Sequence, residues 1–287
     1  MIPLDQKKFI NFKSGLYVVS TPIGNMMDIT LNAIEILKLS DLILCEDTRV
    51  SKKILEKHSI KNKEIFAYHK FNEKKSLTKI IKSLDNQKIV SIISDAGTPC
   101  ISDPGSILIN ECINKKIDIF SIPGPSSVIS AVSISGFSDK FIFYGFFPEK
   151  IKDIKKDIEI LSKINLTIVF FISAKKFKKA SVHLKNFFSD RKILICKELT
   201  KMYEQHFRLN VSEIEDFNTD LRGEITLVLS EKLESESNMK LSEKDKLIIR
   251  KLMKKLSIKD VVTEIKKNKD ISKKEIYNYC LQVKNEK

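Results

Sequence analysis

Short apolar runs alternate with amphipathic stretches along the first half of the chain. The apolar runs predict strands at 16–20, 41–46, 64–69, 89–94 and 117–123. Between them, apolar residues recur at helical spacing and predict helices at 29–40, 50–58, 74–84 and 104–115. Strand and helix in alternation are typical of a mostly parallel sheet that helices cover on both faces. We therefore expect an α/β domain here.

The second half contains more strand and then ends in helix alone. Strands are predicted at 140–147, 166–173, 191–199, 203–209 and 223–230, and helices near 128–135, 151–163, 175–188 and 211–217. This pattern favours a second α/β domain with mixed strand pairing. From about Lys240 the pattern is purely helical, and Ser272 with Glu275 could form a capping box for the last helix. The expected organisation is two α/β/α domains, 1–126 and 127–235, followed by a helical tail at 236–287.

Glycine and proline mark the places where predicted strands end. Seven of the eight Gly and six of the seven Pro fall between residues 15 and 148. Ligands of open α/β sheets bind beyond the carboxyl ends of the strands. The glycines and prolines of this chain are therefore concentrated where a ligand would bind.

The segment "SDAGTPCISDPG" (94–105) follows a predicted buried strand. Gly97 allows a positive φ, Pro99 stiffens the turn, and Ser102 or Asp103 can cap the next helix. Its carboxylates suit a ligand with hydroxyl and amine groups and would repel phosphate. No G-x-G-x-x-G or G-x-x-x-x-G-K-[ST] motif occurs, which disfavours dinucleotide and P-loop sites. A purely structural strand–helix connection is the alternative for one such loop.

Two further segments have the same anatomy as this loop. They are "STPIGN" (20–25) and "SIPGPSS" (121–127), each with Pro and Gly at the end of a predicted strand. Three rigid loops at three strand ends can converge, so we expect them to line one crevice. The alternative is that their prolines only end the strands.

Charge and cysteine content narrow the class of protein. The formal net charge is +14, and residues 238–287 hold 15 basic and 7 acidic residues, a net +8. A basic excess in the tail suits RNA, although a solvated lysine-rich helix explains it equally. Five scattered cysteines predict neither a disulfide framework nor a metal site. We expect a cytoplasmic chain with no membrane partner, because no apolar run reaches about 20 residues and no signal peptide is recognisable.

A family resemblance rests on several long segments in register. They are "LYVVSTPIGNMMDIT", "CEDTRVSKKIL", "SDAGTPCISDPG", "PGPSSVISAVSISG", "FYGFFPEK", "KELTKMYE" and "RGEITLVL". In this order and spacing they resemble the RsmI-type enzymes, the ribosomal RNA small subunit methyltransferase I family of the tetrapyrrole methylase superfamily. The resemblance covers nearly the whole chain, from Gly15 to about Gln282.

The resemblance implies a fold, a cofactor and a reaction. It implies two α/β/α domains of tetrapyrrole methylase type, with S-adenosylmethionine in the cleft between them and a short C-terminal helical segment. The implied reaction is 2′-O-methylation of cytidine-1402 in 16S rRNA on the assembled 30S small subunit, by a homodimer. The tetrapyrrole branch carries G-x-G-x-G-D in its first loop, where this chain has "TPIGN", so the RNA branch is favoured.

The expected site residues fall into three groups. The cofactor clamp is expected at Pro22, Ile23, Gly24, Asp95, Ala96, Gly97, Thr98, Ser102, Asp103, Gly105, Pro123, Gly124, Pro125 and Ser126. For the chemistry we expect "CEDTR", with Asp47 taking a proton or orienting the ribose, Arg49 gripping a phosphate and Glu46 beside them. A salt-bridged strand end is the alternative for these three. Substrate contacts are expected from Lys176, Glu198, Lys201, Arg250, Lys251 and Lys254.

One stretch departs from the family pattern. Where the family has F-Y-E-S-P-H-R, residues 170–176 read "FFISAKK", so Lys176 keeps the charge of the Arg but not its bidentate fork. The missing Glu and His cannot be essential here. Two other functions therefore stay open: a tetrapyrrole methyltransferase, and a non-catalytic RNA-binding protein of ribosome assembly.

Overall fold

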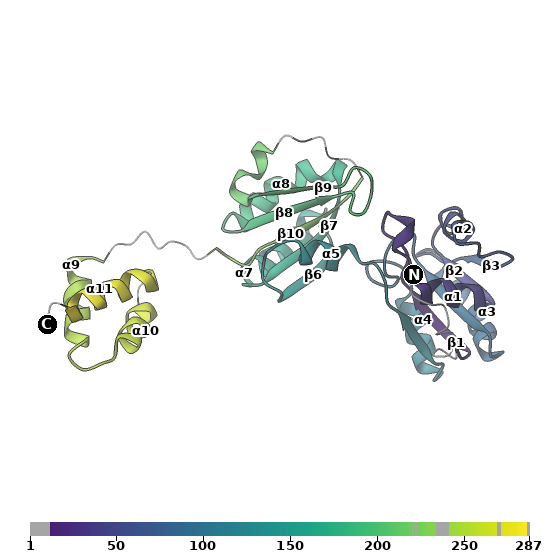
Figure 1. Cartoon of the computed structure of the whole chain (residues 1–287), viewed down its shortest axis with the longest axis horizontal. Coiled ribbons are helices and arrows are strands. Elements are labelled where there is room, and N and C mark those ends of the chain that lie inside the picture. Colours follow the sequence, from purple (N-terminus) through teal and green to yellow (C-terminus); the bar gives the residue numbers. More distant parts are fainter. Residues whose placement is uncertain are drawn as a thin grey trace, which may run out of the picture. The chain divides into compact units, whose positions relative to one another are not determined.

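The computed structural model describes residues 12–217, 219, 221, 223–233, 241–268 and 271–285. The chain divides into two compact units, one ending at Glu231 and the other beginning at Lys232 (Figure 1). The first unit contains two five-stranded sheets, and the elements described in the second unit are helices.

The first sheet is entirely parallel, as the alternating pattern predicts. Its strands lie in the order β3-β2-β4-β1-β5. Their bounds are β1 Gly15–Val19, β2 Leu42–Cys45, β3 Glu64–Ala67, β4 Ile89–Ile93 and β5 Ile119–Ile122. The connecting helices are η1 Met26–Asp28, α1 Leu31–Leu39, α2 Thr48–Lys57, α3 Glu73–Asp85 and α4 Ser106–Asn114.

Both faces of this sheet are buried, which explains its continuous apolar strands. Along β2, Leu42 and Leu44 pack with residues of α3 and α4, whereas Ile43 and Cys45 pack with residues of α1 and α2. Successive side chains of a strand point to opposite faces, so the four residues of β2 contribute to two hydrophobic cores, one on each face of the sheet.

The second sheet is mixed, with strand order β6-β7-β10-β8-β9. Only β6 and β7 pair in parallel, and the remaining pairs are antiparallel. The strands are β6 Phe141–Phe146, β7 Thr167–Ser173, β8 Lys192–Lys197, β9 Gln205–Asn210 and β10 Glu224–Leu229. The helices are α5 Ser127–Ser133, α6 Ile151–Asp153, η2 Ile154–Ile158, α7 Glu159–Lys163, α8 Ala174–Phe188 and η3 Val211–Asp216.

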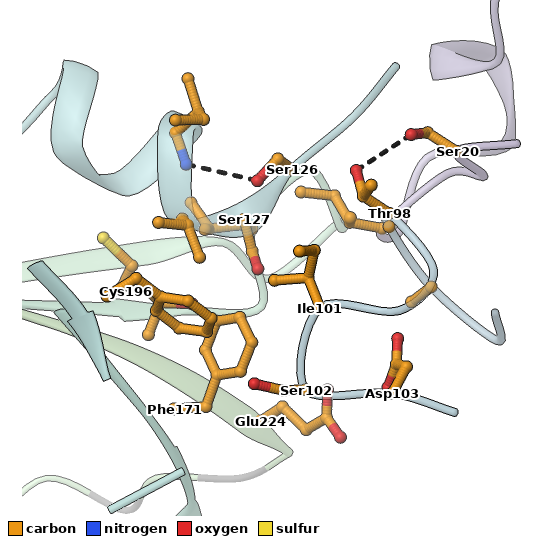
Figure 2. Close-up of a pocket in the computed structure, with 18 of the residues that line it drawn as sticks. Ser20, Thr98, Ile101, Ser102, Asp103, Ser126, Ser127, Phe171, Cys196 and Glu224 are labelled. Carbon is orange, nitrogen blue, oxygen red and sulfur yellow. Dashed lines mark hydrogen bonds between the residues drawn. The ribbon is translucent and has the colours of Figure 1, made fainter. Parts of the chain in front are cut away.

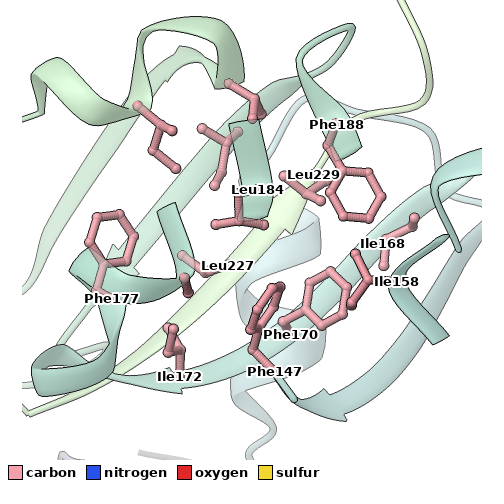
Figure 3. Packing of buried hydrophobic residues seen from close by; sticks show 14 of the residues in the cluster. Phe147, Ile158, Ile168, Phe170, Ile172, Phe177, Leu184, Phe188, Leu227 and Leu229 are labelled. Carbon is pink, nitrogen blue, oxygen red and sulfur yellow. The ribbon is translucent and has the colours of Figure 1, made fainter. Parts of the chain in front are cut away.

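The larger core of the second domain lies between this sheet and α8 (Figure 3). Phe170 of β7 is fully buried there, against Phe188 of α8 and Phe147. On the opposite face, Val128 and Ala131 of α5 pack against strands β7, β8 and β10. Helix α5 therefore packs on the second sheet, which supports the boundary predicted at residue 126; the boundary itself stays a prediction.

A buried arginine joins the ends of several elements in this domain. Arg191 is 0% exposed, and its guanidinium donates to the carbonyls of Leu166 at 2.8 Å and Ser230 at 2.7 Å, and also to that of Ile164. Burial lowers the pKa of Arg191. A group with five fixed donors suits this place because it satisfies several carbonyls at once.

The C-terminal unit is a small helical bundle of α9 Glu243–Leu252, α10 Ile258–Asn268 and α11 Lys273–Asn285. Its core includes Ile249, Val261 and Ile276. The expected cap of the last helix is present in part, because Ser272 Oγ accepts a hydrogen bond from the Glu275 N–H at 3.1 Å.

The predicted fold class is confirmed, and each predicted strand is present. Two helical segments differ in kind: 211–217 is a 3-10 helix, and 151–163 contains a π-helical turn at η2. The boundary expected between residues 235 and 236 lies outside the described residues. Within the described part of the chain, no helix is long and apolar enough to cross a membrane.

Candidate active site

Hydrogen bonds tie the three predicted loops together at the carboxyl ends of the first sheet's strands. Thr21 and Gly97 exchange two backbone hydrogen bonds, of 2.9 and 3.0 Å. Next to them, the hydroxyls of Ser20 and Thr98 lie 2.9 Å apart, and Thr98 Oγ1 also donates to the Pro125 carbonyl at 3.3 Å. The loops 20–25, 94–105 and 121–127 therefore meet, as their anatomy predicts.

These loops line a cavity of about 770 Å³ that the second domain completes (Figure 2). From the first half of the chain come Ser20, Ile23, Glu46, Asp95, Ala96, Gly97, Thr98, Ile101, Ser102, Asp103, Ser121, Pro123, Gly124, Ser126, Ser127, Val128 and Ile129. The second sheet and its loops add Phe141, Phe143, Phe146, Phe171, Ile172, Cys196, Glu198, Leu199, Lys201, Glu224, Ile225 and Thr226.

Ten of the fourteen residues expected to clamp the cofactor line this cavity. The four that do not are Pro22, Gly24, Gly105 and Pro125. Two of these four residues, Gly24 and Gly105, shape the walls of the cavity without lining it. The assignment of any of the fourteen to a cofactor stays a prediction.

Gly105 holds the 94–105 loop in place through a buried carboxylate. Its N–H donates to Glu73 Oε1 at 2.8 Å, and Tyr68 Oη donates to the same oxygen at 3.1 Å. At φ +138°, Gly105 also passes so close to Cys100 that a Cβ would lie 2.2 Å from the sulfur. Glu73 is a positioning residue that the sequence analysis missed, because it lies on α3, far along the chain from the loop.

Gly24 lets the first domain contact the second. A Cβ at Gly24 would lie 2.5 Å from Lys201 Cγ and 2.8 Å from the Leu199 carbonyl oxygen. Beside it, the Asn25 N–H donates to Thr200 Oγ1 at 3.0 Å. The first loop and the loop after β8 therefore close one side of the cavity.

Five carboxylates line the cavity: Glu46, Asp95, Asp103, Glu198 and Glu224. Burial, and then the charge of Glu46, raise the pKa of Asp103 to about 6, with smaller contributions from Asp95 and Glu224. Burial, followed by the charge of Asp95, raises the pKa of Glu46. Asp103 is thus poised to exchange a proton near neutral pH.

Asp47 and Arg49 lie beside the cavity rather than in its lining. Asp47 caps α2 by accepting from the Arg49 N–H at 2.8 Å, and its carboxylate pairs with the Arg49 guanidinium at 2.6 Å. These hydrogen bonds lower the pKa of Asp47 to about 2. The Asp47 N–H donates to Asp95 Oδ1 at 3.0 Å. The arrangement resembles the alternative of a salt-bridged strand end, and of this group Glu46 alone reaches the cavity.

The expected substrate residues fall in three places. Glu198 and Lys201 line the cavity and form an ion pair of 2.9 Å. Lys176 lies outside the lining on α8, where Glu149 pairs with it at 2.5 Å. Arg250 and Lys251 of α9, and Lys254 just after it, belong to the C-terminal unit, where Arg250 and Lys254 line a separate hollow of about 530 Å³. Their contact with RNA stays a prediction.

The sequence analysis missed the floor of the cavity. Phe171, Thr226 and Cys196 are cross-strand neighbours on β7, β10 and β8, and all three face the cavity. Alternation along each predicted strand could have indicated them, because each shares a face with an apolar residue two positions away. The pairing order β7-β10-β8, which brings them together, has no local signal.

Comparison with known proteins agrees with this geometry. The family model for tetrapyrrole (corrin/porphyrin) methylases matches residues 15–215. A protein of Rickettsia prowazekii (strain Madrid E), named ribosomal RNA small subunit methyltransferase I, is 42% identical over 93% of this chain and 96% of its own length. The chain belongs to this family. A protein of the same name from Thermotoga maritima is 43% identical over 76% of the chain and 98% of its own length.

Solved structures share the fold at low sequence identity. The methyltransferase CobJ has a TM-score of 0.59 at 13% identity, covering 76% of this chain and 94% of its own. Uroporphyrin-III C-methyltransferase from Thermus thermophilus, complexed with S-adenyl homocysteine, has a TM-score of 0.55 at 14% identity, covering 75% and 97%. The likeness shows that this chain shares the fold of these two methyltransferases.

Proposed function

We propose that this chain methylates the 2′-hydroxyl of cytidine-1402 in 16S rRNA, on the assembled 30S subunit, in the cytoplasm and as a homodimer. The rRNA methyltransferase class follows from its membership of the ribosomal RNA small subunit methyltransferase I family. The observation that carries the proposal is the single cavity formed where the three loops of the family's motifs meet.

S-adenosylmethionine is the cofactor, and the cavity's donor set fits it. The carboxylate of Asp95 can accept hydrogen bonds from a ribose hydroxyl or from an ammonium group. Ile23, Ile101 and Val128 offer apolar surface for a purine ring. A volume of about 770 Å³ lies within the range of roughly 300–1,000 Å³ typical of small-molecule sites. When bound, the cofactor supplies an electrophilic methyl group.

The chain's own contribution is to orient the acceptor hydroxyl and to remove its proton. The hydroxyl oxygen must lie about 3–3.5 Å from the methyl carbon and in line with the breaking bond. Asp103 is the best placed carboxylate to accept the proton on one of its oxygens, since its pKa of about 6 leaves it ionised at pH 7.5. In this assignment Glu46 raises the basicity of Asp103 instead of taking the proton itself. The apolar side chains of Ile101 and Phe146 would reduce access of water.

The experiment that tests this function is transfer of labelled methyl groups to small subunits lacking the mark, followed by mapping of 2′-O-methyl sites in 16S rRNA. We expect one labelled cytidine in the decoding region. Uroporphyrinogen serves as the competing substrate, because a tetrapyrrole enzyme would label it and leave the rRNA unmodified. A chain that neither binds S-adenosylmethionine in calorimetry nor labels either substrate would be a non-catalytic RNA-binding protein.

A further inference from the structure

An irregularity in β6 turns an aromatic ring into the cavity. Phe143 pairs with Val169 of β7, but Gly145, two residues on, pairs with the very next residue, Phe170. Tyr144 is therefore the extra residue of a β-bulge, next to Gly145 at φ +99°.

The bulge reverses the alternation of β6. Before it, Phe141 and Phe143 face the cavity, while Tyr144 packs against the larger core. After it, Phe147 joins that core and Phe146 lines the cavity, although strict alternation would place them the other way round. A bulge next to a site commonly redirects a side chain in this manner.

Phe146 reaches the cavity with much of its ring uncovered. It is 54% exposed, and its ring contacts Phe171 edge to face, with 5.6 Å between centroids and 67° between planes. Phe143 also contacts the Phe171 ring, with 4.8 Å between centroids. An exposed aromatic face beside a fixed aromatic edge is a platform on which a nucleobase can stack.

A carboxylate lies on the same face of the sheet as this platform. Glu224 begins β10, two residues before Thr226, the cross-strand neighbour of Phe171. It lines the cavity, opposite Ser102 and Asp103 of the first domain (Figure 2). Among the residues that the structure describes, none donates a hydrogen bond to Glu224 or forms an ion pair with it. Its oxygens can therefore accept from a ligand.

The chemistry of this wall differs from that of the opposite one. The loops of the first domain offer hydroxyls and three carboxylates. The second sheet and its loops offer aromatic rings and two carboxylates, of which Glu198 is paired with Lys201. The exocyclic amine of cytosine is a donor that pairs with Glu or Asp. Uracil presents a carbonyl at the same position, which a carboxylate would repel.

We propose that Phe146, Phe171 and Glu224 form the subsite for the target base, with the cytosine ring stacked on Phe146 and its exocyclic amine donating to Glu224. This assignment rests on the function proposed above. It makes Phe146 a residue for affinity and Glu224 the residue that discriminates cytidine from uridine.

The test compares Phe146→Leu and Glu224→Gln with the parent in methylation of small subunits whose target nucleotide is either cytidine or uridine. For Phe146→Leu we expect a rise in KM for the subunit of about tenfold, from the loss of one stacked base, and recovery in Phe146→Tyr. For Glu224→Gln, whose amide can also donate, we expect the preference for cytidine over uridine to fall about tenfold. Calorimetric affinity for S-adenosylmethionine should be unchanged in both variants.

Matched controls are Phe71→Leu and Glu35→Gln, at exposed positions outside the cavity lining. Parental KM and base preference in both subsite variants would overturn the assignment while leaving the proposed function intact. A weakened cofactor affinity in Phe146→Leu would also overturn it, because the ring would then serve the cofactor. A parent that binds the cofactor but labels no small subunit would overturn the proposed function and this assignment together.

Discussion

Replacing Asp103 by Asn should make the chain more stable and less active. The pKa of Asp103 is about 6 in the folded state, against 3.8 for the ordinary group. A carboxyl with a raised pKa costs no stability below pH 3.8, where it is protonated in both states. Above pH 6 it is ionised in both states, and the folded state then bears the full cost of the buried charge. The cost therefore grows as the pH rises from about 4 to 6.

The size of the effect follows from the two pKa values. A difference of about two corresponds to about 3 kcal/mol at pH 7.5. Because the carboxyl is only half-buried and water screens it, we expect about 1–2 kcal/mol, or a rise in Tm of about 2–6 °C. Asn keeps an oxygen that can accept the hydrogen bond from Ser94. About half of the gain should remain at pH 5.

The assay is thermal unfolding by circular dichroism at pH 5 and pH 7.5, with methyl transfer measured in parallel. Asp139→Asn, at an exposed position outside the cavity, is the matched control. Parental kcat/KM should rise with pH through about 6 and then level off, since the ionised carboxylate accepts the proton. Asp103→Asn should lose at least about a hundredfold in rate. Equal Tm values at pH 7.5, or a variant with undiminished rate, would refute this reasoning.

Three further substitutions test the walls and the core. Glu73→Gln weakens the hydrogen bond from the Gly105 N–H, and calorimetry should show cofactor affinity about tenfold lower, whereas unchanged affinity would mean that the loop holds its shape alone. Gly24→Ala places a methyl group 2.8 Å from a backbone oxygen of the second domain. We expect a similar loss of cofactor affinity with Tm nearly unchanged. Parental affinity would show that the first loop and the loop after β8 can separate to accommodate the methyl group. Arg191→Met leaves several buried carbonyls without a donor, so urea unfolding should show a loss of about 3 kcal/mol or more, with Arg191→Lys losing less; equal stability of Met and parent would exclude this role.

Most of the strands could be predicted because each contains a short run of apolar residues. Even β3 and β9, whose residues are largely half-exposed or exposed, contain Ile65 and Phe66, and Phe207, residue types that favour strands. Strand order was harder to predict, because β10 lies between β7 and β8 in the sheet although it follows both in the chain. Pairing between distant segments depends on the burial of whole faces and has no signal in a short window.

The loop half of the site was predictable, and the sheet half was not. Gly97 and its neighbours indicate a constrained turn at a strand end. The carboxyl ends of parallel strands lie at one edge of a sheet, so such turns can be expected to meet there. Phe146 gives no such signal, because simple alternation assigns Phe147 to the cavity and Phe146 to the core. The bulge that exchanges them depends on Gly145, where a Cβ would lie 3.1 Å from Ser102 Oγ of the other wall. Part of the requirement for glycine at position 145 is therefore a contact with a residue more than forty positions away in the chain.

Left-handed backbone at residues other than glycine occurs on both sides of the cavity. Among the described residues, Cys100 and Ser102 on one side and Glu198 and Thr200 on the other have φ between 54° and 67°, and Ser59, Asn62, Gln87 and Lys116 have similar angles outside the cavity lining. Such conformations cost of order 1 kcal/mol or more each and persist only where the surroundings enforce them. Here Glu204 enforces one by accepting from the Thr200 N–H at 2.6 Å. This hydrogen bond therefore holds the loop after β8, which closes one side of the cavity, in a conformation that most residues avoid.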